Sequence, residues 1–329
     1  MKLYKRMAAL FLSVAAVFLL IPAATSAAEA IDLSRDVRLT ISYQDGDVPL
    51  AGAEFSIYLV ADVDENGELT TTPAFRQFNV DIRGKNDAAW KALARTLEGY
   101  VLRDQIEPTD SGATGQSGFL YFPTGSTKMT PGLYLVLGQR HTQNGRRYDA
   151  TPFMVMLPTR SENTWSYEVI ASPKHTDQEI PDTPTDITRK VLKVWDDNGH
   201  ENSRPSEITV QLLRDGEIYD TVTLNAGNNW RYTWSGLDDD YSWTIVEKEL
   251  SGYTVRVDQE GVTFVVTNTY VPTTPDTPTQ PTKPSPATPG KPSLPQTGQL
   301  WWPVPVLMFA GLVLVVAGLL RRRRESNGE

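Results

Sequence analysis

The sequence predicts an all-β protein of two antiparallel β-sandwich domains in tandem, with one helical insertion in the first domain. Short segments rich in valine, isoleucine, threonine and aromatic residues recur roughly every ten residues, separated by glycine, asparagine and aspartate, as is typical of such sandwiches. Two polar stretches rich in proline and threonine, residues 175–188 and 271–293, divide the chain. We therefore expect domains at 31–174 and 189–270, joined by a linker at 175–188.

The first domain combines strands with one helix. Its strand-like segments are 37–43, 53–60, 133–137, 151–157 and 164–171. Residues 86–102 differ, because their apolar side chains fall on one face at helical spacing: Trp90, Leu93, Ala94, Leu97 and Val101. Either Asn86 or Asp87 can cap the start of this helix.

The second domain has only strand signals. Its seven segments are 191–195, 208–213, 219–224, 230–234, 242–247, 253–257 and 262–270. Glycine, asparagine and aspartate fill the gaps between them, as expected for tight turns in an antiparallel sandwich.

Composition narrows the chemistry that the chain can perform. The 329 residues include no cysteine and three scattered histidines, which excludes thiol catalysis, disulfides and cysteine-based metal sites. We find no Ser/His/Asp, Cys/His or paired-carboxylate arrangement, so we expect no enzyme acting on an external substrate, no metal and no cofactor. The net charge of −9 argues against a nucleic-acid partner.

The N-terminus predicts a secretory signal peptide over residues 1–28. Lys2, Lys5 and Arg6 precede an apolar run at 7–21, and small residues follow at 24–28. The apolar run, about 15 residues, is short for a membrane span, which disfavours an anchor at this end.

The C-terminus carries three elements in order. Leu294, Pro295, Gln296, Thr297 and Gly298 precede an apolar stretch at 300–320, and four arginines at 321–324 begin a basic cytoplasmic tail at 321–329. This arrangement resembles the sorting signal of Gram-positive sortase substrates, L-P-x-T-G followed by a transmembrane helix and a basic tail. The resemblance implies cleavage between Thr297 and Gly298 and transfer of the Thr297 carbonyl to an amine. The alternative is a plain single-span membrane protein.

The composition of residues 271–293 predicts a spacer that crosses the cell wall. Eight of its 23 residues are proline, a composition that favours extended polyproline II and builds no core. At about 3.1 Å per residue it would extend to about 70 Å.

The second domain resembles a collagen-adhesin B-type (CnaB) repeat. The matching segments are KVWDDNG, TVQLLRDGE, NWRYTW, TIVEKELSGY and VTNTY, at 193–199, 209–217, 229–234, 244–253 and 266–270. The resemblance implies an immunoglobulin-like (CnaB/prealbumin-like) sandwich and an intramolecular isopeptide bond between Lys193 and Asn268, formed autocatalytically with Glu247 as the catalytic acid. Such a reaction is physically consistent, because burial favours a neutral amine and a protonated carboxyl.

Two alternatives compete with this reading. Lys190 is a second amine, three residues away and therefore on the opposite face of the strand. Lys193 could also be an ordinary surface lysine and Asn268 a turn residue.

In the first domain, Tyr43 and Gly138 occupy the positions of the lysine and the acid, so we expect no isopeptide bond there.

The end of the first domain resembles that of a Spa-type pilin N-terminal domain. The family motif is W-x-x-x-V-x-V-Y-P-K, and Trp165, Val169, Pro173 and Lys174 match it, whereas alanine and serine replace the second valine and the tyrosine. The resemblance implies that Lys174 accepts the sortase-bound threonine of another subunit. The alternative is an ordinary exposed lysine after a strand.

These features predict a structural protein of the Gram-positive cell wall, namely a sortase-processed pilus subunit whose precursor is transiently inserted in the membrane. The expected partners are a sortase, peptidoglycan and other pilin subunits. Backbone and basal roles both stay open. The alternative is a monomeric wall-anchored adhesin for a host ligand, with the second domain as its stalk.

Overall fold

The computed structural model describes residues 30–272, apart from residues 85, 127, 162, 163, 182 and 184. The predicted signal peptide, sorting motif, transmembrane segment and basic tail lie outside these residues, as does the spacer beyond residue 272. Within the described part of the chain, no helix is both long and apolar enough to cross a membrane.

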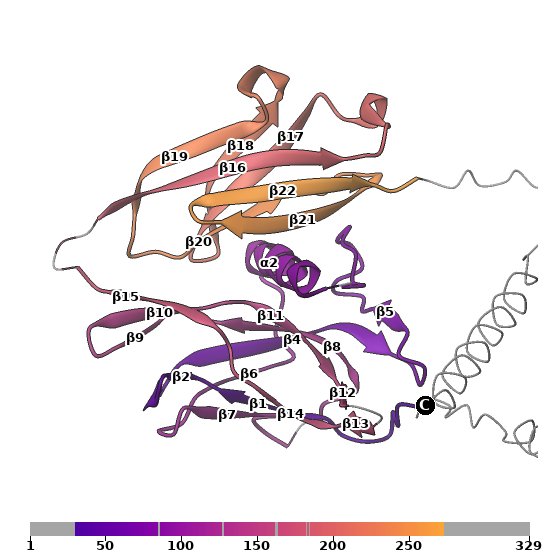
Figure 1. Ribbon diagram of the computed structural model, residues 1–329, viewed down its shortest axis with the longest axis vertical. Helices are drawn as coiled ribbons and strands as arrows, with labels where there is room; N and C mark the ends of the chain where they lie inside the picture. The colour runs from indigo at the N-terminus through magenta and orange to yellow at the C-terminus, as the bar shows by residue number, and fades with distance from the viewer. Residues whose placement is uncertain are drawn as a thin grey trace, which may run out of the picture. The chain divides into compact units, whose positions relative to one another are not determined.

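The second domain is a sandwich of two sheets (Figure 1). Its strands are β16 (Asp186–Asp196), β17 (Glu207–Arg214), β18 (Glu217–Asn225), β19 (Arg231–Asp238), β20 (Trp243–Glu247), β21 (Tyr253–Glu260) and β22 (Thr263–Tyr270), with short 3-10 turns at Glu201–Ser203 and Ala226–Asn228. The sheet orders are β19-β16-β22-β21 and β18-β17-β20. All seven predicted strands are therefore confirmed.

The inner faces of these sheets follow the two-residue period of a strand. In β22, Phe264, Val266 and Asn268 are buried while their neighbours are partly exposed. The core between the sheets contains Val210 and Leu212 from β17, which face Phe264 and Val266. The first and last strands, β16 and β22, lie side by side and run parallel, so both chain ends of the domain belong to one sheet.

The first domain is built from several small sheets. Its strands are β1 (Arg38–Ser42), β2 (Gln44–Asp45), β3 (Val48–Pro49), β4 (Glu54–Val63), β5 (Leu69–Thr71), β6 (Asp110–Ala113), β7 (Phe119–Phe122), β8 (Gly132–Gly138), β9 (His141–Gln143), β10 (Arg146–Ala150), β11 (Phe153–Leu157), β12 (Thr159–Ser161), β13 (Thr164–Ser166), β14 (Glu168–Ala171) and β15 (His175–Glu179). The main sheets have the orders β14-β1-β7, β11-β8-β4-β5 and β15-β10-β9. Leu39, Ile41, Phe55 and Phe122 contribute to the buried core that they enclose.

The predicted linker is shorter than expected. Residues 175–179 form β15, which pairs antiparallel with β10, so Ala150 lies opposite His175 and Arg146 opposite Glu179. This strand is polar and largely exposed, and it therefore has no apolar alternation by which sequence could reveal it. The irregular connection to β16 begins only after Glu179.

The helix α2 (Asp87–Asp104) is capped by Asn86 rather than Asp87, because the Asn86 side chain accepts a hydrogen bond from the Ala89 amide at 2.9 Å. Both domains belong to one compact unit, and α2 lies between them (Figure 1). Its buried face packs in a core that combines Leu97 and Leu135 of the first domain with Leu213 and Val246 of the second.

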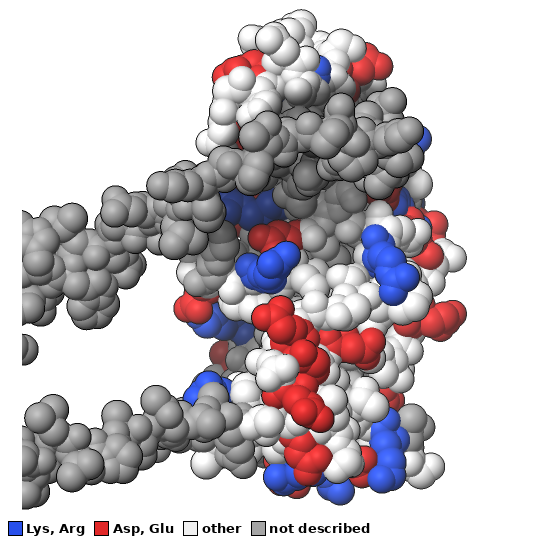
Figure 2. Space-filling model, turned by 90° about the vertical axis from the view of Figure 1, so that its right-hand side faces the viewer, with Lys and Arg blue, Asp and Glu red and all other residues white. Residues whose placement is uncertain are grey.

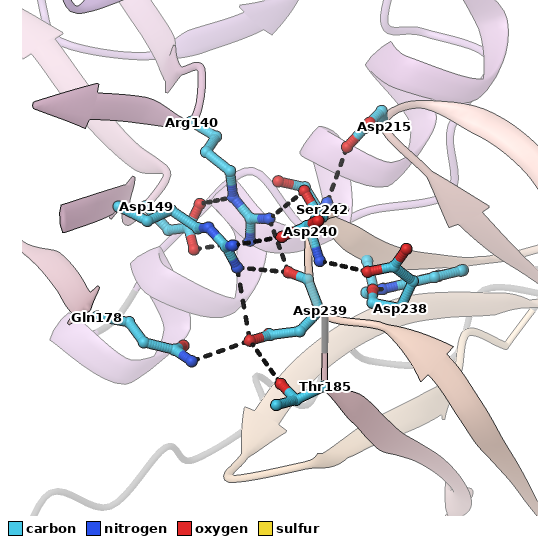
Figure 3. Close-up of polar contacts among 11 residues, drawn as sticks. Arg140, Asp149, Gln178, Thr185, Asp215, Asp238, Asp239, Asp240 and Ser242 are labelled. Atoms are coloured by element: carbon cyan, nitrogen blue, oxygen red, sulfur yellow. Dashed lines mark hydrogen bonds and ion pairs between the residues drawn. The ribbon is translucent and has the colours of Figure 1, made fainter. Parts of the chain in front are cut away.

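A polar cluster, which we call the interdomain clamp, joins β10 and its neighbours to the turn between β19 and β20 (Figure 3). The Arg147 guanidinium donates to the Asp239 carbonyl at 2.5 Å and to the Asp240 carboxylate at 2.7 Å. Gln178 donates to the Asp239 carboxylate at 2.9 Å, and Arg140 donates to the carbonyls of Asp239 and Asp240 at 3.1 and 2.8 Å. Arg147 and Asp239 are both buried, so this pair within the clamp is a desolvated contact.

The described surface has mixed charge. Acidic side chains gather over the first domain on the face drawn in Figure 2, with lysine and arginine side chains interspersed. Together with the formal net charge of −9, this distribution opposes non-specific adhesion of the protein to anionic surfaces.

We predict that Arg147→Ala lowers the free energy of unfolding by about 3 kcal/mol, because it leaves the buried Asp239 carboxylate without its cationic partner. Urea denaturation measures this loss. The matched control is Arg146→Ala on the same strand, whose ion pairs with Asp177 and Glu179 are solvent-accessible and should contribute little. Equal losses in both variants would show that the clamp does not stabilise the protein.

Candidate functional site

Three polar side chains from different strands meet inside the second domain. Lys193 lies in β16, Asn268 in the neighbouring β22, and Glu247 at the end of β20 in the opposite sheet. The parallel register pairs Lys193 with Val266 and Trp195 with Asn268, which places the lysine and asparagine side chains on the same inner face. Lys193, Glu247 and Asn268 are only 4%, 1% and 0% exposed.

One carboxylate contacts both of the other groups. Asn268 donates a hydrogen bond through Nδ2 to Glu247 Oε1 at 2.6 Å, and Lys193 Nζ lies 3.6 Å from Glu247 Oε2. Asn268 Oδ1 and Glu247 Oε2 are buried and have no hydrogen-bond partner among the described residues. The site therefore holds an amine, an acid and an amide whose carbonyl oxygen is free to be polarised.

Burial changes the acid–base properties of this pair. Desolvation lowers the pKa of Lys193 to about 8, although the charge of Glu247 opposes this shift. Desolvation likewise raises the pKa of Glu247, against the effect of Lys193. The neutral amine and the protonated carboxyl thus become accessible near neutral pH, and these are the forms that nucleophilic attack on an amide requires.

An aromatic wall encloses the amine. Lys193 Nζ lies 4.1 Å from the centroid of the Trp195 ring, and Trp230 and Tyr253 pack edge-on against that ring at 5.2 and 5.3 Å. Sequence analysis missed this role of Trp195, although its position two residues after Lys193 places it on the same strand face. The aromatic rings shield the Lys193 amine from solvent and so contribute to its desolvation.

Lys190 and Lys193 lie on opposite faces of β16 and differ in exposure. Lys190 is exposed and lies on the outer face of β16, as its spacing from Lys193 predicts. Lys193 is buried, so it is not an ordinary surface lysine.

The residues of the pilin motif lie together at the end of the first domain and apart from the buried triad. Trp165 in β13 and Val169 in β14 pack against the first-domain core. Pro173 and Lys174 lie between β14 and β15, where the Lys174 carbonyl accepts a hydrogen bond from the Thr151 amide at 2.7 Å. The backbone of Lys174 is thus held in place while its side chain is exposed.

The first domain has an aromatic cluster at the positions that correspond to the lysine and the acid. Tyr43 is buried and packs edge-to-face on Phe55 and His175, with ring centroids 5.1 and 5.3 Å apart. Gly138 leaves room for this cluster, since a Cβ there would lie 2.7 Å from Phe55 and from Ala150. Neither position supplies an amine or an acid.

Comparison with known proteins assigns a family to each domain. Residues 38–176 match the Gram-positive pilin subunit D1, N-terminal domain, and residues 189–269 match the Cna protein B-type domain. The collagen adhesin of Staphylococcus aureus is 35% identical over 151 residues, which cover 36% of this chain and 13% of the adhesin. The chain therefore spans a small part of that relative.

Two solved structures also align with the chain. The major pilin SpaD from Corynebacterium diphtheriae is 16% identical, with a TM-score of 0.28, over 73% of this chain and 65% of the pilin. A single B repeat unit of the S. aureus collagen-binding surface protein is 20% identical, with a TM-score of 0.26, over 72% of this chain and 99% of the repeat. These scores are too low to carry an argument, so the assignment rests on the two domain matches. The chain thus combines a region that matches the Gram-positive pilin D1 N-terminal domain with one that matches the Cna protein B-type domain, and these two domains support a pilus subunit or the stalk of a surface adhesin.

Proposed function

We propose that this protein is a sortase-processed pilus subunit of the Gram-positive cell wall, reinforced by an autocatalytic isopeptide bond between Lys193 and Asn268. The observation that carries the proposal is the buried contact of Glu247, on β20, with an amine and an amide that lie on the first and last strands of the domain. Such a set of polar groups is costly to bury unless it reacts or is fully paired.

The reaction needs no cofactor. Neutral Lys193 Nζ attacks Cγ of Asn268, the new Nζ–Cγ bond forms, and the Cγ–Nδ2 bond breaks to release ammonia. The two oxygens of Glu247 face the two nitrogens, at 3.6 Å from Nζ and 2.6 Å from Nδ2. The carboxyl can therefore take the proton from the attacking amine and deliver it to the leaving nitrogen, which balances the reaction.

The bond would change how the domain resists force. It would join β16 to β22, residues 75 apart in sequence and at the two ends of the domain. By analogy with a disulfide, closing a loop of this size stabilises the fold by about 4 kcal/mol. Tension that enters at β16 would pass through the bond to β22 without separating the strands.

We expect recombinant residues 31–293 to weigh about 17 Da less than their sequence mass, because ammonia is lost when the amine is acylated. Intact-mass spectrometry checks this. Glu247→Ala should restore the full mass while the sandwich still folds, whereas Lys190→Ala, which changes an exposed lysine of the same strand, should retain the loss. A full-mass wild-type protein would exclude the bond.

The rate of bond formation should depend on pH through the protonation of Lys193 and Glu247. The reactive state holds one proton on Lys193 and Glu247 together. Because burial lowers the pKa of Lys193 to about 8, the last proton is lost above that pH, and the rate should fall about tenfold per pH unit there. Chain recovered unfolded from inclusion bodies and refolded at several pH values tests this by mass. A rate that keeps rising above pH 9 would contradict it.

Polymerisation would use a second lysine. A sortase would cleave after Thr297 and transfer its carbonyl to Lys174 of another subunit, or to peptidoglycan for attachment to the wall. Lys174 suits the acceptor role, since its side chain is exposed and its main chain is fixed by the bond from Thr151. The proline-rich spacer at 271–293 favours a basal or minor subunit, whereas the presence of both donor and acceptor fits a backbone subunit.

The second candidate is a monomeric wall-anchored adhesin with a host ligand. The similarity to the S. aureus collagen adhesin favours it, because the second domain would then serve as a stalk. The two candidates differ in whether Lys174 is used.

We predict that enzymatically released wall protein forms a high-mass ladder on an immunoblot and that Lys174→Ala collapses it. Lys190→Ala, another exposed lysine, should leave the ladder intact. Loss of the lowest bands alone would indicate the basal role. A single wall-linked species in both the wild type and the Lys174 variant would exclude a pilus and leave the adhesin.

A further inference from the structure

The second-domain sandwich is open on the side where the triad's acid lies. β20, which carries Glu247, is the last strand of its sheet, and β21 is the last strand of the other. An edge strand presents backbone groups that no neighbouring strand satisfies. In this protein the first domain covers that open side with α2 and the segment before it.

The first domain supplies hydrogen-bond partners to β21. The Val257 amide donates to the Thr96 hydroxyl of α2 at 2.8 Å, and the Val255 amide donates to the Asn79 carbonyl at 2.8 Å. The Asn79 side chain also donates to the Leu250 carbonyl at 3.1 Å. These bonds replace those that a further strand would make.

The same helix sits directly on β20. A Cβ at Gly99 would lie 2.6 Å from the Ile245 carbonyl oxygen, so only glycine allows the helix to approach the strand this closely. Val246 packs in the shared core with Leu97 of α2. Ile245 and Val246 are the two residues immediately before Glu247.

Both sets of contacts fall beside the reacting groups. Val255, bonded to Asn79, is the cross-strand partner of Asn268. Val257, bonded to Thr96, is the cross-strand partner of Val266, which in turn lies beside Lys193. The first domain thus holds two strands in place: β20 just before Glu247, and β21, which pairs with the strand that carries Asn268.

We propose that α2 positions the cross-linking site, with Thr96 and Gly99 as positioning residues that act through β21 and β20, so that the bond in the second domain forms only when the first domain is docked. This inference rests on the proposed Lys193–Asn268 bond. The attack requires the amine and the amide carbon at near-contact geometry, and a displacement of about 1 Å can slow such reactions about 100-fold. An uncovered edge at β20 and β21 would permit displacements of that size.

Docking would then control the order of maturation. The first domain precedes the second in the chain and would leave the export channel first. The second domain would become cross-linked only after it has folded against α2. A subunit with a misfolded first domain would therefore not form the Lys193–Asn268 bond.

The test follows bond formation in the chain 31–293 after refolding, by intact mass of acid-quenched samples. Thr96→Val keeps the side-chain shape but removes the acceptor for Val257, and it should slow the loss of 17 Da about tenfold. Thr96→Ser restores the hydroxyl and should react within about twofold of wild type. The control is Thr114→Val, which removes another buried threonine hydroxyl, bonded to Ala53 and Leu50 within the first domain, and should leave the rate unchanged.

Gly99→Ala provides a second variant that does not weaken the helix, since alanine favours helix more than glycine. Its methyl group meets the β20 backbone, and the rate should fall about 100-fold. Wild-type rates in both Thr96→Val and Gly99→Ala would overturn the inference while the bond itself stands. Equal slowing in Thr114→Val would overturn it too, because the effect would then follow global stability. A wild-type chain that never loses the 17 Da would refute the bond itself, and the inference with it.

Discussion

The burial of Lys193, Glu247 and Asn268 between two sheets is the constraint on which the second domain depends. A charged amine and a carboxylate lose most of their hydration there, and their separation of 3.6 Å repays only part of that cost. One oxygen of Asn268 and one of Glu247 have no hydrogen-bond partner among the described residues, which adds to that cost. Conversion of the amine and the amide into a secondary amide would remove the buried charge of the amine, so the fold itself would drive the proposed cross-link.

This constraint extends into the first domain through the strands that hold the triad. One of those strands, β20, lies at the edge of its sheet, and β21, which pairs with β22, lies at the edge of the other sheet. The position of Glu247 on an edge strand therefore depends on the contacts that cover that edge. α2 provides this cover, and the Arg147–Asp239 clamp holds the turn that precedes β20, so the two domains belong to one compact unit. The helical insertion, which interrupts an otherwise all-β chain, therefore has a definite structural role.

Sequence could predict the parts of this arrangement that follow a period. All seven strands of the second domain follow from their patterns, and the two-residue period separates Lys190 from Lys193. The choice of Lys193, Glu247 and Asn268 came from the resemblance to the CnaB family. The apolar face of α2 was predictable, but its partner was not, because amphipathicity indicates that a face is buried and not what covers it. β15 escaped prediction because it is polar and largely exposed, so it has no apolar alternation that would indicate a strand.

The proposed acceptor role of Lys174 would explain why only the second domain needs a cross-link. In a fibre joined through Lys174 and Thr297, tension would travel along the chain from residue 174 to β16, through the Lys193–Asn268 bond, and out along the spacer. The first-domain core precedes Lys174 and lies outside that path, so the aromatic packing of Tyr43 and Phe55 is sufficient there. The structures under load would be the five-residue ladder between β15 and β10 and the clamp on Arg147, both non-covalent. The proposed covalent bond would thus lie in the domain that carries the force, and the first domain, whose core lies outside that path, would serve to position it.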